Sequence, residues 1–544
     1  MLRVRWLGTV PYRDALAVQQ ALFDHGREQH LLLLEHPHVF TYGPRSDLAT
    51  NLRCDPAAVH ADLVGVRRGG DITYHGPGQL VGYPIVEVRN RLAANEHVRN
   101  VEQLVIDALA TFGVLAGRVR EHPGVWVDVE GPEPRKICAI GVRLKGGRTM
   151  HGLALNVAPD MTYLREHIVA CGIAGRPVTS LAEEGVHVPM RDVVDVVARL
   201  AGERWGNGVS ERQDVAWRHR VDDLSLFSRR AGPGEPVRMA SRLAAAGVTG
   251  GLSIESRKPA WLRPHVRHGT AVLDLQRTVR QLGLVTVCED AGCPNLSECW
   301  ADGTATFMVL GERCTRACGF CLVDTRKPDA PAADEPARVA EAIAFMKLDH
   351  AVLTMVARDD LADGGMGHVA ACVEAIRTRR PGTRVETLIA DARGDDDALQ
   401  ALFAVRPDVL NHNVETVARL QRAVRPSAGY ARSLSVLARA KAAGLTTKSG
   451  LIVGMGETDG EVDGALADLA GIGVDIVTIG QYLRPTSHHL PVERWVEPAR
   501  FARWAAVGEA LGIGHVEASP LTRSSYHARQ AADAVDRAMP VLVR

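Results

Sequence analysis

The strongest constraint on the fold is a regular alternation of apolar and amphipathic segments between residues 305 and 511. Short, mostly apolar runs between helical patterns are typical of strands buried on both faces of a parallel sheet. The candidate strands are Ala305–Leu310, His350–Val356, Arg384–Ile389, Val409–Asn411, Thr447–Val453 and Asp475–Ile479. The helical patterns include His368–Arg377, Tyr430–Ala443 and Pro498–Leu511. This order predicts an α/β domain built as a full or partial TIM barrel, with its chemistry at the C-terminal ends of the strands.

The first part of the chain mixes strands and helices without strict alternation, which predicts an α+β domain on a mixed sheet. Its candidate strands are His30–Glu35, Leu80–Val86, Trp126–Val129, Ile137–Arg143 and Met150–Val157. Its candidate helices are Asp14–His25, Glu96–Phe112 and Met190–Arg204. A stretch rich in Gly and Pro, from Ser228 to Pro264, separates the two parts. We therefore predict an N-terminal domain at 1–228, a linker at 229–256 and a C-terminal domain at 257–544.

The composition excludes several classes of protein. Lys plus Arg and Asp plus Glu both number 64, so no net charge favours nucleic acid or an anionic membrane surface. The chain has no run of about 20 apolar residues and no secretory signal at its N-terminus, which predicts a cytoplasmic protein. Six of the 10 cysteines fall between residues 288 and 321. In a reducing compartment such a cluster favours metal or redox chemistry over disulfides.

Three of these cysteines, Cys314, Cys318 and Cys321, form a C-x3-C-x2-C motif directly after the first candidate strand of the second part. Thiolates at this spacing can bind three irons of a 4Fe–4S cluster and leave the fourth iron open for a ligand. The alternative is a zinc site that takes its fourth ligand from elsewhere in the chain. The number of ligands favours the cluster.

This motif resembles that of the radical S-adenosylmethionine superfamily. The resemblance implies that the open iron binds S-adenosylmethionine and that Phe320, which precedes the last cysteine, packs against the adenine. A later segment is similar to the motif that the superfamily places beside the adenine, and its matching positions are Gly450, Ile452, Gly454 and Glu457. Taken alone, that segment is equally typical of a buried strand that ends in a glycine turn.

A second triplet, Cys288, Cys293 and Cys299, precedes the first with C-x4-C-x5-C spacing. Within the superfamily the two triplets together resemble lipoyl synthase over about residues 257–535. Further matching segments are Arg358–Gly365, Asn411–Thr416, Gln481–Pro491 and Arg523–Ala528. The resemblance implies two 4Fe–4S clusters, the second held by these three cysteines and Ser525. It also implies that sulfur from the second cluster enters C6 and C8 of a protein-bound octanoyl chain, with electrons from a donor such as ferredoxin or flavodoxin.

Three stretches of the first part suggest acyl transfer. Arg68-Gly-Gly-Asp-Ile-Thr-Tyr-His75 places glycines where a backbone can approach a ligand closely. Lys136 is one of only two lysines before residue 257, and Cys171 supplies a thiol, the natural nucleophile toward a thioester. A lysine beside a thiol lowers the thiol pKa or takes its proton. The alternatives are an inert, buried Cys171 and His75 or His151 as the base.

Together these stretches resemble the lipoyl(octanoyl) transferases over about residues 1–215. These transferases are related in fold to the biotin and lipoate protein ligases, so the resemblance implies an N-terminal α+β domain of that type. It implies that Cys171 accepts the acyl group and that Lys136 lowers the thiol pKa and shuttles the proton. The residues implied to line the acyl site are Arg68, Gly69, Gly70, Asp71, Ile72, Thr73, Tyr74, His75, Ala139, Ile140, Gly141, Gly152, Leu153 and Ala154.

The two resemblances predict a bifunctional enzyme of lipoate biosynthesis and protein lipoylation, an octanoyltransferase fused to a lipoyl synthase. The expected partners are octanoyl-acyl carrier protein, the lipoyl domains of 2-oxoacid dehydrogenase E2 subunits and glycine-cleavage H protein, with no nucleic acid and no membrane. One alternative is an ATP-dependent lipoate ligase fused to another radical enzyme. The other is a non-catalytic iron–sulfur scaffold.

Overall fold

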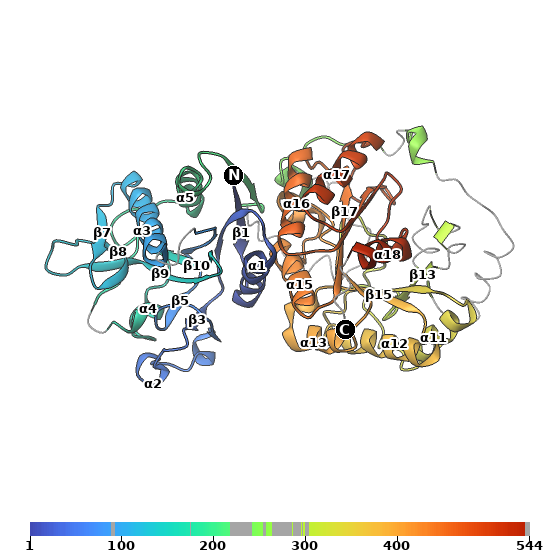
Figure 1. Ribbon diagram of the computed structural model, residues 1–544, viewed down its shortest axis with the longest axis horizontal. Helices are drawn as coiled ribbons and strands as arrows, with labels where there is room; N and C mark the ends of the chain where they lie inside the picture. The colour runs from blue at the N-terminus through green and yellow to red at the C-terminus, as the bar shows by residue number, and fades with distance from the viewer. Residues whose placement is uncertain are drawn as a thin grey trace. The chain divides into compact units, whose positions relative to one another are not determined.

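The computed structural model describes residues 1–88, 93–173, 176–217, 242–253, 257–263, 285–286, 295, 298–299 and 304–538. The chain divides into two compact units, Met1–Trp217 and Arg218–Arg544. Each unit has its own large sheet and its own hydrophobic core. Figure 1 labels the helices and strands of both units.

The sheet of the first unit is mixed, with the strand order β11-β1-β2-β6-β10-β9-β8-β7. β1 is parallel to both β2 and β11, whereas the strands from β2 onward pair antiparallel. The bounds are β1 Leu2–Thr9, β2 Gln29–Glu35, β6 Gln79–Ile85, β7 Ala116–Val119, β8 His122–Val127, β9 Arg135–Lys145, β10 Arg148–Asn156 and β11 Ser210–Asp214. The predicted α+β class with a mixed sheet is confirmed.

Two helices of the first unit, α3 (Ala93–Thr111) and α5 (Met190–Trp205), bury their apolar residues in the same core as the sheet. Their apolar residues recur at helical spacing, which gives each helix one face for the sheet. The remaining elements are α1 Tyr12–His25, α2 Leu48–Asn51, α4 Thr162–Arg165 and a small sheet of β4 Asp62–Gly65, β3 Val39–Tyr42 and β5 Thr73–His75. The small sheet carries the end of the predicted Arg68–His75 motif.

The sheet of the second unit has the strand order β12-β13-β14-β15-β16-β17-β18-β19. Every pair from β13 to β19 is parallel, and only β12 pairs antiparallel. The bounds are β12 Val285–Thr286, β13 Thr304–Val309, β14 His350–Met355, β15 Arg384–Leu388, β16 Val409–Asn411, β17 Thr446–Val453, β18 Ile476–Gln481 and β19 His515–Ala518. Parallel strands that follow one another in chain order form a partial TIM barrel, as predicted.

Helices connect the strands of this barrel and cover its outer face (Figure 1). Their bounds are α11 Glu335–Phe345, α12 Met366–Arg379, α13 Asp396–Ala404, α14 Gln421–Val424, α15 Tyr430–Ala442, α16 Asp459–Gly471, α17 Pro498–Ala510 and α18 Ala528–Ala538. Local capping explains where α16 begins, because Thr458 and Glu461 form a capping box there. Within the described residues, no helix has both the length and the apolar character needed to cross a membrane.

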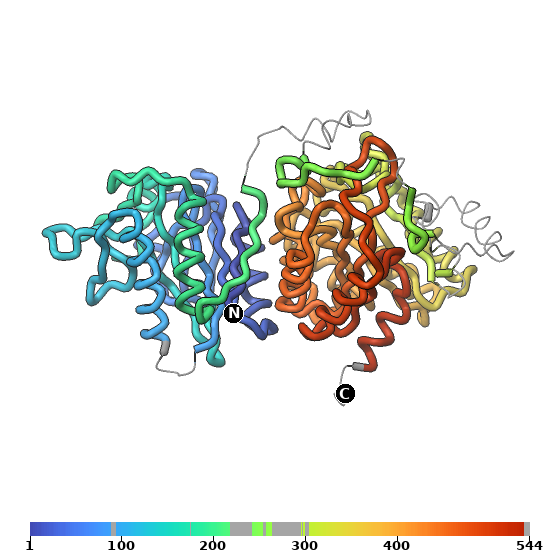
Figure 2. Tube along the Cα trace, turned by 90° about the horizontal axis from the view of Figure 1, so that it is seen from above, coloured from blue at the N-terminus to red at the C-terminus, as the bar shows by residue number. Residues whose placement is uncertain are grey.

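The segment 242–253 packs onto the second unit, although we predicted it as part of the linker (Figure 2). Leu243, Ala246 and Val248 are buried. The backbone N–H of Leu252 donates to the carbonyl of Val492 at 2.6 Å. Apolar side chains inside the Gly- and Pro-rich stretch therefore anchor part of it, a feature that composition averaged over the stretch does not reveal.

A buried ion pair lies among the strands of the barrel. Lys448 on β17 donates to both oxygens of Glu386 on β15, at 3.0 and 3.1 Å. Asn411 on β16, the strand between them, donates to Glu386 at 2.8 Å. Both charged side chains have 0% exposure. Burial by itself raises the pKa of Glu386, but Lys448, His350 and Asn411 together outweigh burial and bring that pKa down to about 2.

Candidate functional site

The backbone holds Cys171 in a fixed place beside the Arg68–His75 motif. Cys171 lies in a short 3-10 turn with a left-handed φ of 59°, which is uncommon for a residue with a side chain. Its N–H donates to the carbonyl of Ile72 at 2.9 Å. The next residue, Gly172, lies so close to Asp71 that an added Cβ would be 2.8 Å from the carboxylate. The thiol is therefore placed by the loop that sequence predicted for the acyl site.

Lys136 is buried on β9, with 6% exposure. Its Nζ donates to the carbonyl of Pro123 at 3.2 Å and lies 4.7 Å from the ring centroid of Trp126. Among the described residues no carboxylate forms an ion pair with it. The segment that follows Cys171 fixes the lysine backbone, because Lys136 N–H donates to Pro177 and its carbonyl accepts from Thr179. The backbone of Lys136 is thus tied to the segment after Cys171, and its amine has no carboxylate partner in the part of the chain that the structure describes.

Cys138 shows that Lys136 and Cys171 share one region. Burial raises the pKa of the Cys138 thiol to about 12, the Lys136 ammonium lowers it, and Cys171 raises it further. Both groups therefore act electrostatically on the same thiol. Cys138 itself is 0% exposed and belongs to the hydrophobic core. A thiol that stays protonated in a core is inert, so Cys138 fits a structural role.

The strand residues implied for the acyl site face one another. Ala139, Ile140 and Gly141 on β9 pair with Ala154, Leu153 and Gly152 on β10. The loop with Arg68, Gly69 and Gly70 lies against the same strand, since Gly69 N–H donates to Val142 at 3.2 Å. An added Cβ at Gly141 would be 3.0 Å from the carbonyl of Gly69. The structure therefore brings these predicted residues together. The close approach of the Gly69 carbonyl to β9 explains why position 141 is a glycine.

Arg68 organises that loop. Its Nη1 donates to the carbonyl of Asp71 at 2.8 Å, and its Nη2 donates to the carbonyl and hydroxyl of Thr41 at 2.7 and 2.9 Å. Burial lowers the pKa of Arg68, and Tyr12 and Cys171 oppose that shift. The guanidinium therefore lies within electrostatic reach of Cys171. Ile72 and Tyr74 point elsewhere, into a cluster with Phe40.

The two histidines considered as bases are both held neutral. Burial lowers the pKa of His151 to about 3, and Arg68 and Arg143 lower it as well. Burial also lowers the pKa of His75 well below its usual range. His75 Nδ1 bonds to Gln79 at 2.8 Å, which ties the ring into a side-chain network. Groups with such low pKa values are poor proton acceptors, which leaves Lys136 as the stronger candidate.

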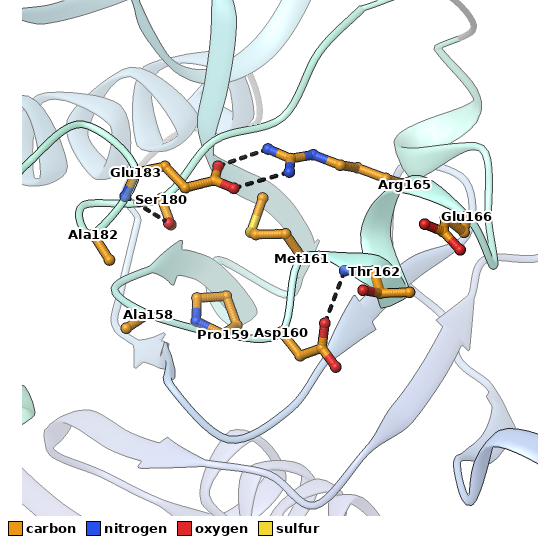
Figure 3. Close-up of a pocket in the computed structure, with 10 residues that line it drawn as sticks. All are labelled: Ala158, Pro159, Asp160, Met161, Thr162, Arg165, Glu166, Ser180, Ala182 and Glu183. Carbon is orange, nitrogen blue, oxygen red and sulfur yellow. Dashed lines mark hydrogen bonds and ion pairs between the residues drawn. The ribbon is translucent and has the colours of Figure 1, made fainter.

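The first unit also has a cavity of about 430 Å³, shown in Figure 3. Its lining residues are Ala158, Pro159, Asp160, Met161, Thr162, Arg165, Glu166, Ser180, Ala182 and Glu183. An ion pair between Arg165 and Glu183 crosses it, with contacts of 2.8 and 2.6 Å. None of the residues predicted for the acyl site lines this cavity. Most of its lining residues are polar.

The loop after β13 carries the first cysteine triplet at the C-terminal edge of the sheet. The N–H of Cys314 donates to the backbone carbonyl of Asp324 at 2.8 Å, and the N–H of Cys321 donates to the backbone carbonyl of Cys318 at 3.2 Å. His489 Nε2 bonds to the carbonyl of Cys321 at 2.9 Å. His489 therefore braces the loop.

The three thiols lie close enough to affect one another. Burial raises the pKa of Cys321 to about 12, and Cys318 and Cys314 raise it further. The N–H of Arg316 donates to Cys314 Sγ at 3.4 Å, a contact that suits a thiolate. Within the described residues, no three His, Cys, Asp or Glu side chains converge on a single metal ion. Three thiols on one short loop fit a cluster, in which each thiolate binds its own iron.

Sequence reasoning missed the ion pairs that anchor this loop. Arg316, between Cys314 and Cys318, donates to Asp359 at 2.7 and 2.8 Å and to Asp391 at 2.6 Å. Asp359 follows β14 and Asp391 follows β15, so the guanidinium joins the loop to two strand ends. Asp391 has 2% exposure, and Arg316 holds its pKa well below the usual range against the effect of burial. The Arg358–Gly365 motif contains Asp359 but does not reveal its partner.

We expect Asp391→Asn to weaken this anchor. A buried hydrogen bond to a charged group stabilises by about 1.5–3 kcal/mol, so the free energy of opening of residues 310–321 should fall by about 2 kcal/mol. Hydrogen exchange of that peptide in the full chain measures the change, and iron content per chain should fall with it. Asp463→Asn, which breaks the exposed bidentate pair with Arg503, is the control, with an expected effect below about 1 kcal/mol. Equal changes in the opening free energy of residues 310–321 in the two variants would contradict the anchoring role of Asp391.

The positions implied for S-adenosylmethionine lie at the same edge. Glu457 binds its own loop, because Gly454 N–H donates to it at 2.6 Å and Met455 N–H at 3.0 Å. Gly450 has no room for a side chain, since an added Cβ would be 2.7 Å from Asn413 Oδ1. Phe320 and Ile452 are half-buried. Glu457 therefore shapes the turn after β17, and Gly450 allows a close approach between strands.

Of the second triplet, Cys288 and Cys293 lie outside the described residues. Cys299 is half-buried, and its segment contacts the segment of Ser525. Asn295 donates to the carbonyl of Leu521 at 2.7 Å, and Tyr526 Oη donates to Glu298 at 3.3 Å. The structure therefore brings together the two described members of the predicted second ligand set, from parts of the chain that are far apart in sequence.

Known proteins match both units. The family model of the lipoyl protein ligase A/B catalytic domain matches residues 11–200, and that of the radical SAM superfamily matches residues 308–469. Lipoyl synthase of Kineococcus radiotolerans is 53% identical over 272 residues, 50% of this chain and 82% of that protein. Lipoyl synthase of Mycobacterium avium is 53% identical over 282 residues, 51% of this chain and 92% of that protein. The chain belongs to the lipoyl synthase family.

The lipoyl synthase part occupies the second unit, and the first unit carries the ligase-type catalytic domain. The chain is therefore a fused enzyme of lipoate biosynthesis, as the sequence predicted. S-adenosylmethionine and iron–sulfur clusters are the cofactors of its lipoyl synthase part, which favours a cluster over zinc. Among solved structures, a bipartite lipoate protein ligase from Thermoplasma acidophilum has 18% identity and a TM-score of 0.34, over 41% of this chain and 89% of that one.

Proposed function

We propose that this chain performs both steps of lipoyl assembly on a carrier protein. In the first unit, the Cys171 thiolate attacks the thioester of octanoyl-acyl carrier protein and releases the carrier thiol. A lysine amine of a lipoyl domain then takes the octanoyl group as an amide and restores the Cys171 thiol. In the second unit, sulfur replaces hydrogen at C6 and C8 of that octanoyl chain. The observation that carries the proposal is the placement of Cys171 against Ile72 in the acyl-site loop.

The surroundings of Cys171 support a transferase over an ATP-dependent ligase. A ligase activates its acid with ATP and needs no nucleophilic thiol, whereas Cys171 is half-buried and fixed in a left-handed turn. Lys136 is the proton carrier in this proposal, because it is a buried amine without a carboxylate partner among the described residues. His75 and His151 have pKa values too low for that task.

We propose two 4Fe–4S clusters in the second unit. Cys314, Cys318 and Cys321 would hold the first, whose open iron suits S-adenosylmethionine. When bound, this cluster supplies the electron that starts radical chemistry on S-adenosylmethionine. The cysteines at 288, 293 and 299 with Ser525 would hold the second, which supplies sulfur. Phe320, Gly450, Ile452 and Gly454 would line the S-adenosylmethionine site, with Glu457 holding the loop beneath it.

The partners follow from the two chemistries. The acyl donor is octanoyl-acyl carrier protein, and the acceptors are the lipoyl domains of 2-oxoacid dehydrogenase E2 subunits and glycine-cleavage H protein. A low-potential donor such as ferredoxin or flavodoxin would reduce the first cluster.

The intact mass of an apo lipoyl domain tests the proposed function. The domain is incubated without oxygen with the reconstituted chain, octanoyl-acyl carrier protein, S-adenosylmethionine and a reductant. We expect a shift to the lipoyl mass, and an octanoyl mass alone when S-adenosylmethionine is left out. An octanoyl mass under all conditions would contradict the synthase step. No shift in a chain with verified iron and sulfide would contradict the proposed substrate.

A further inference from the structure

The segment from Leu521 to His527, which contains Ser525, is held by the cysteine segment on one side. Asn295 and Glu298 both precede Cys299 closely in the chain. Asn295 donates to the carbonyl of Leu521 at 2.7 Å, and Glu298 accepts from the hydroxyl of Tyr526 at 3.3 Å. The serine segment and Cys299 therefore lie close together.

The barrel also holds this segment, through Glu517 on β19, which contacts His527 at 3.4 Å, and through Asn413. Asn413 lies just beyond β16 and has 7% exposure. Its Nδ2 donates to Ser524 Oγ at 2.6 Å and to Glu415 Oε1 at 3.0 Å. An amide nitrogen has two protons, so both are used. Ser524 precedes Ser525 directly, and fixing one residue restricts where the next can point.

The backbone of Asn413 is linked to the loop of the first cysteine triplet. Arg425 donates to the carbonyl of Asn413 at 2.9 Å, and the neighbouring carbonyl of Val424 accepts from the N–H of Gly319, which lies between Cys318 and Cys321, at 2.8 Å. The other atom of the Asn413 amide, Oδ1, has no hydrogen-bond partner among the described residues and packs against Gly450. A single buried amide thus lies between the strand that carries Gly450, the loop near the first triplet and the serine segment near Cys299.

We propose that Asn413 is a positioning residue that fixes Ser524 and so presents Ser525 toward Cys299. This inference rests on the proposed function, in which Ser525 and the second cysteine triplet hold a cluster. A serine oxygen is a weaker ligand for iron than a thiolate, so its orientation must be set by neighbouring hydrogen bonds. Asn413 does not touch the reacting atoms, and its effect passes through Ser524.

The test compares full-length wild type, Asn413→Ala, Ser524→Ala and the double variant after anaerobic reconstitution. Two clusters correspond to about eight irons per chain. Iron release to a ferrous-iron chelator is followed with time, and 5′-deoxyadenosine formed from S-adenosylmethionine is measured separately. Ser519→Ala is the matched control, because among the described residues its hydroxyl bonds to Thr522 alone, at 2.8 Å.

In both single variants we expect about four irons to leave roughly fivefold faster, a factor typical of one hydrogen bond. The double variant should be no faster than the singles, and Ser519→Ala should match wild type. Formation of 5′-deoxyadenosine by Ser524→Ala should stay within about twofold of wild type. Wild-type release rates in Ser524→Ala would overturn the proposal, even if Asn413→Ala failed to fold. Parallel loss of 5′-deoxyadenosine formation in Ser524→Ala would also overturn it. A wild-type chain with only about four irons would instead overturn the proposed function.

Discussion

Replacing Cys171 by serine is expected to lower octanoyl transfer to a lipoyl domain by about a thousandfold or more, the scale seen when a catalytic nucleophile is removed. A serine hydroxyl is far less ionised than a thiol at neutral pH and is a weaker nucleophile toward a thioester. Transfer is measured by the intact mass of the lipoyl domain over time. The mass of the chain itself should gain an octanoyl group in wild type and not in the variant.

Cys54→Ser is the matched control, since Cys54 is the other half-buried cysteine described in the first unit. It should transfer at nearly the wild-type rate. Cys171→Ser should still convert a lipoyl domain that already carries octanoyl, because sulfur insertion belongs to the second unit. Continued modification by Cys171→Ser with free lipoate and ATP would contradict the transferase and support the ligase alternative.

Replacing Lys448 by methionine is expected to destabilise the barrel by about 3–5 kcal/mol, since the change leaves the Glu386 carboxylate buried and unpaired. Hydrogen exchange of peptides from β15 and β17 in the full chain measures this loss, and the strands of the first unit serve as an internal reference. Lys441→Met is the control. Its pair with Asp475, at 2.6 Å, is partly exposed, so its loss should have an effect of about 1 kcal/mol or less.

Acidification gives a second check on Lys448. In wild type the pKa of Glu386 is about 2, below its unfolded value, so this group loses stabilising effect as pH falls. Without Lys448, burial raises that pKa above its unfolded value, and protonation then stabilises the fold as pH falls. The difference between wild type and Lys448→Met should therefore narrow between pH 7 and pH 4. A stability difference between wild type and Lys448→Met that stays constant with pH would contradict an effect of charge. So would a double variant Glu386→Gln/Lys448→Met that is less stable than Lys448→Met.

Local pattern accounts well for the regular elements. The predicted strand Val409–Asn411 coincides with β16, and the predicted helix Tyr430–Ala443 differs from α15 by one residue. Elements without an apolar pattern were missed. β11, Ser-Glu-Arg-Gln-Asp, is polar and forms only because β1 pairs with it. The short strands of the small sheet and β19 were also missed, because so few residues do not establish a period.

The candidate site divides in the same way. Cysteine spacing and the family resemblances indicated Cys171, Lys136 and the first triplet. Gly141 proves to be a site of close backbone approach, and Gly450 a site where side chains of neighbouring segments come close. The anchor of the cysteine loop was not predictable, because Arg316 and Asp391 are 75 residues apart. Neither was the low basicity of His75 and His151, which comes from burial.

Periodicity and cysteine spacing predict the architecture and a cluster site, because both are local properties of the chain. The family resemblances add the two chemistries and the residues proposed to carry them. The grouping of those residues in space comes from the tertiary structure. Asn413 meets Ser524 across 111 positions, and Asn295 meets Leu521 across 226. Parallel strands bring their C-terminal ends to one edge, and this geometry brings residues together without leaving a pattern in the sequence.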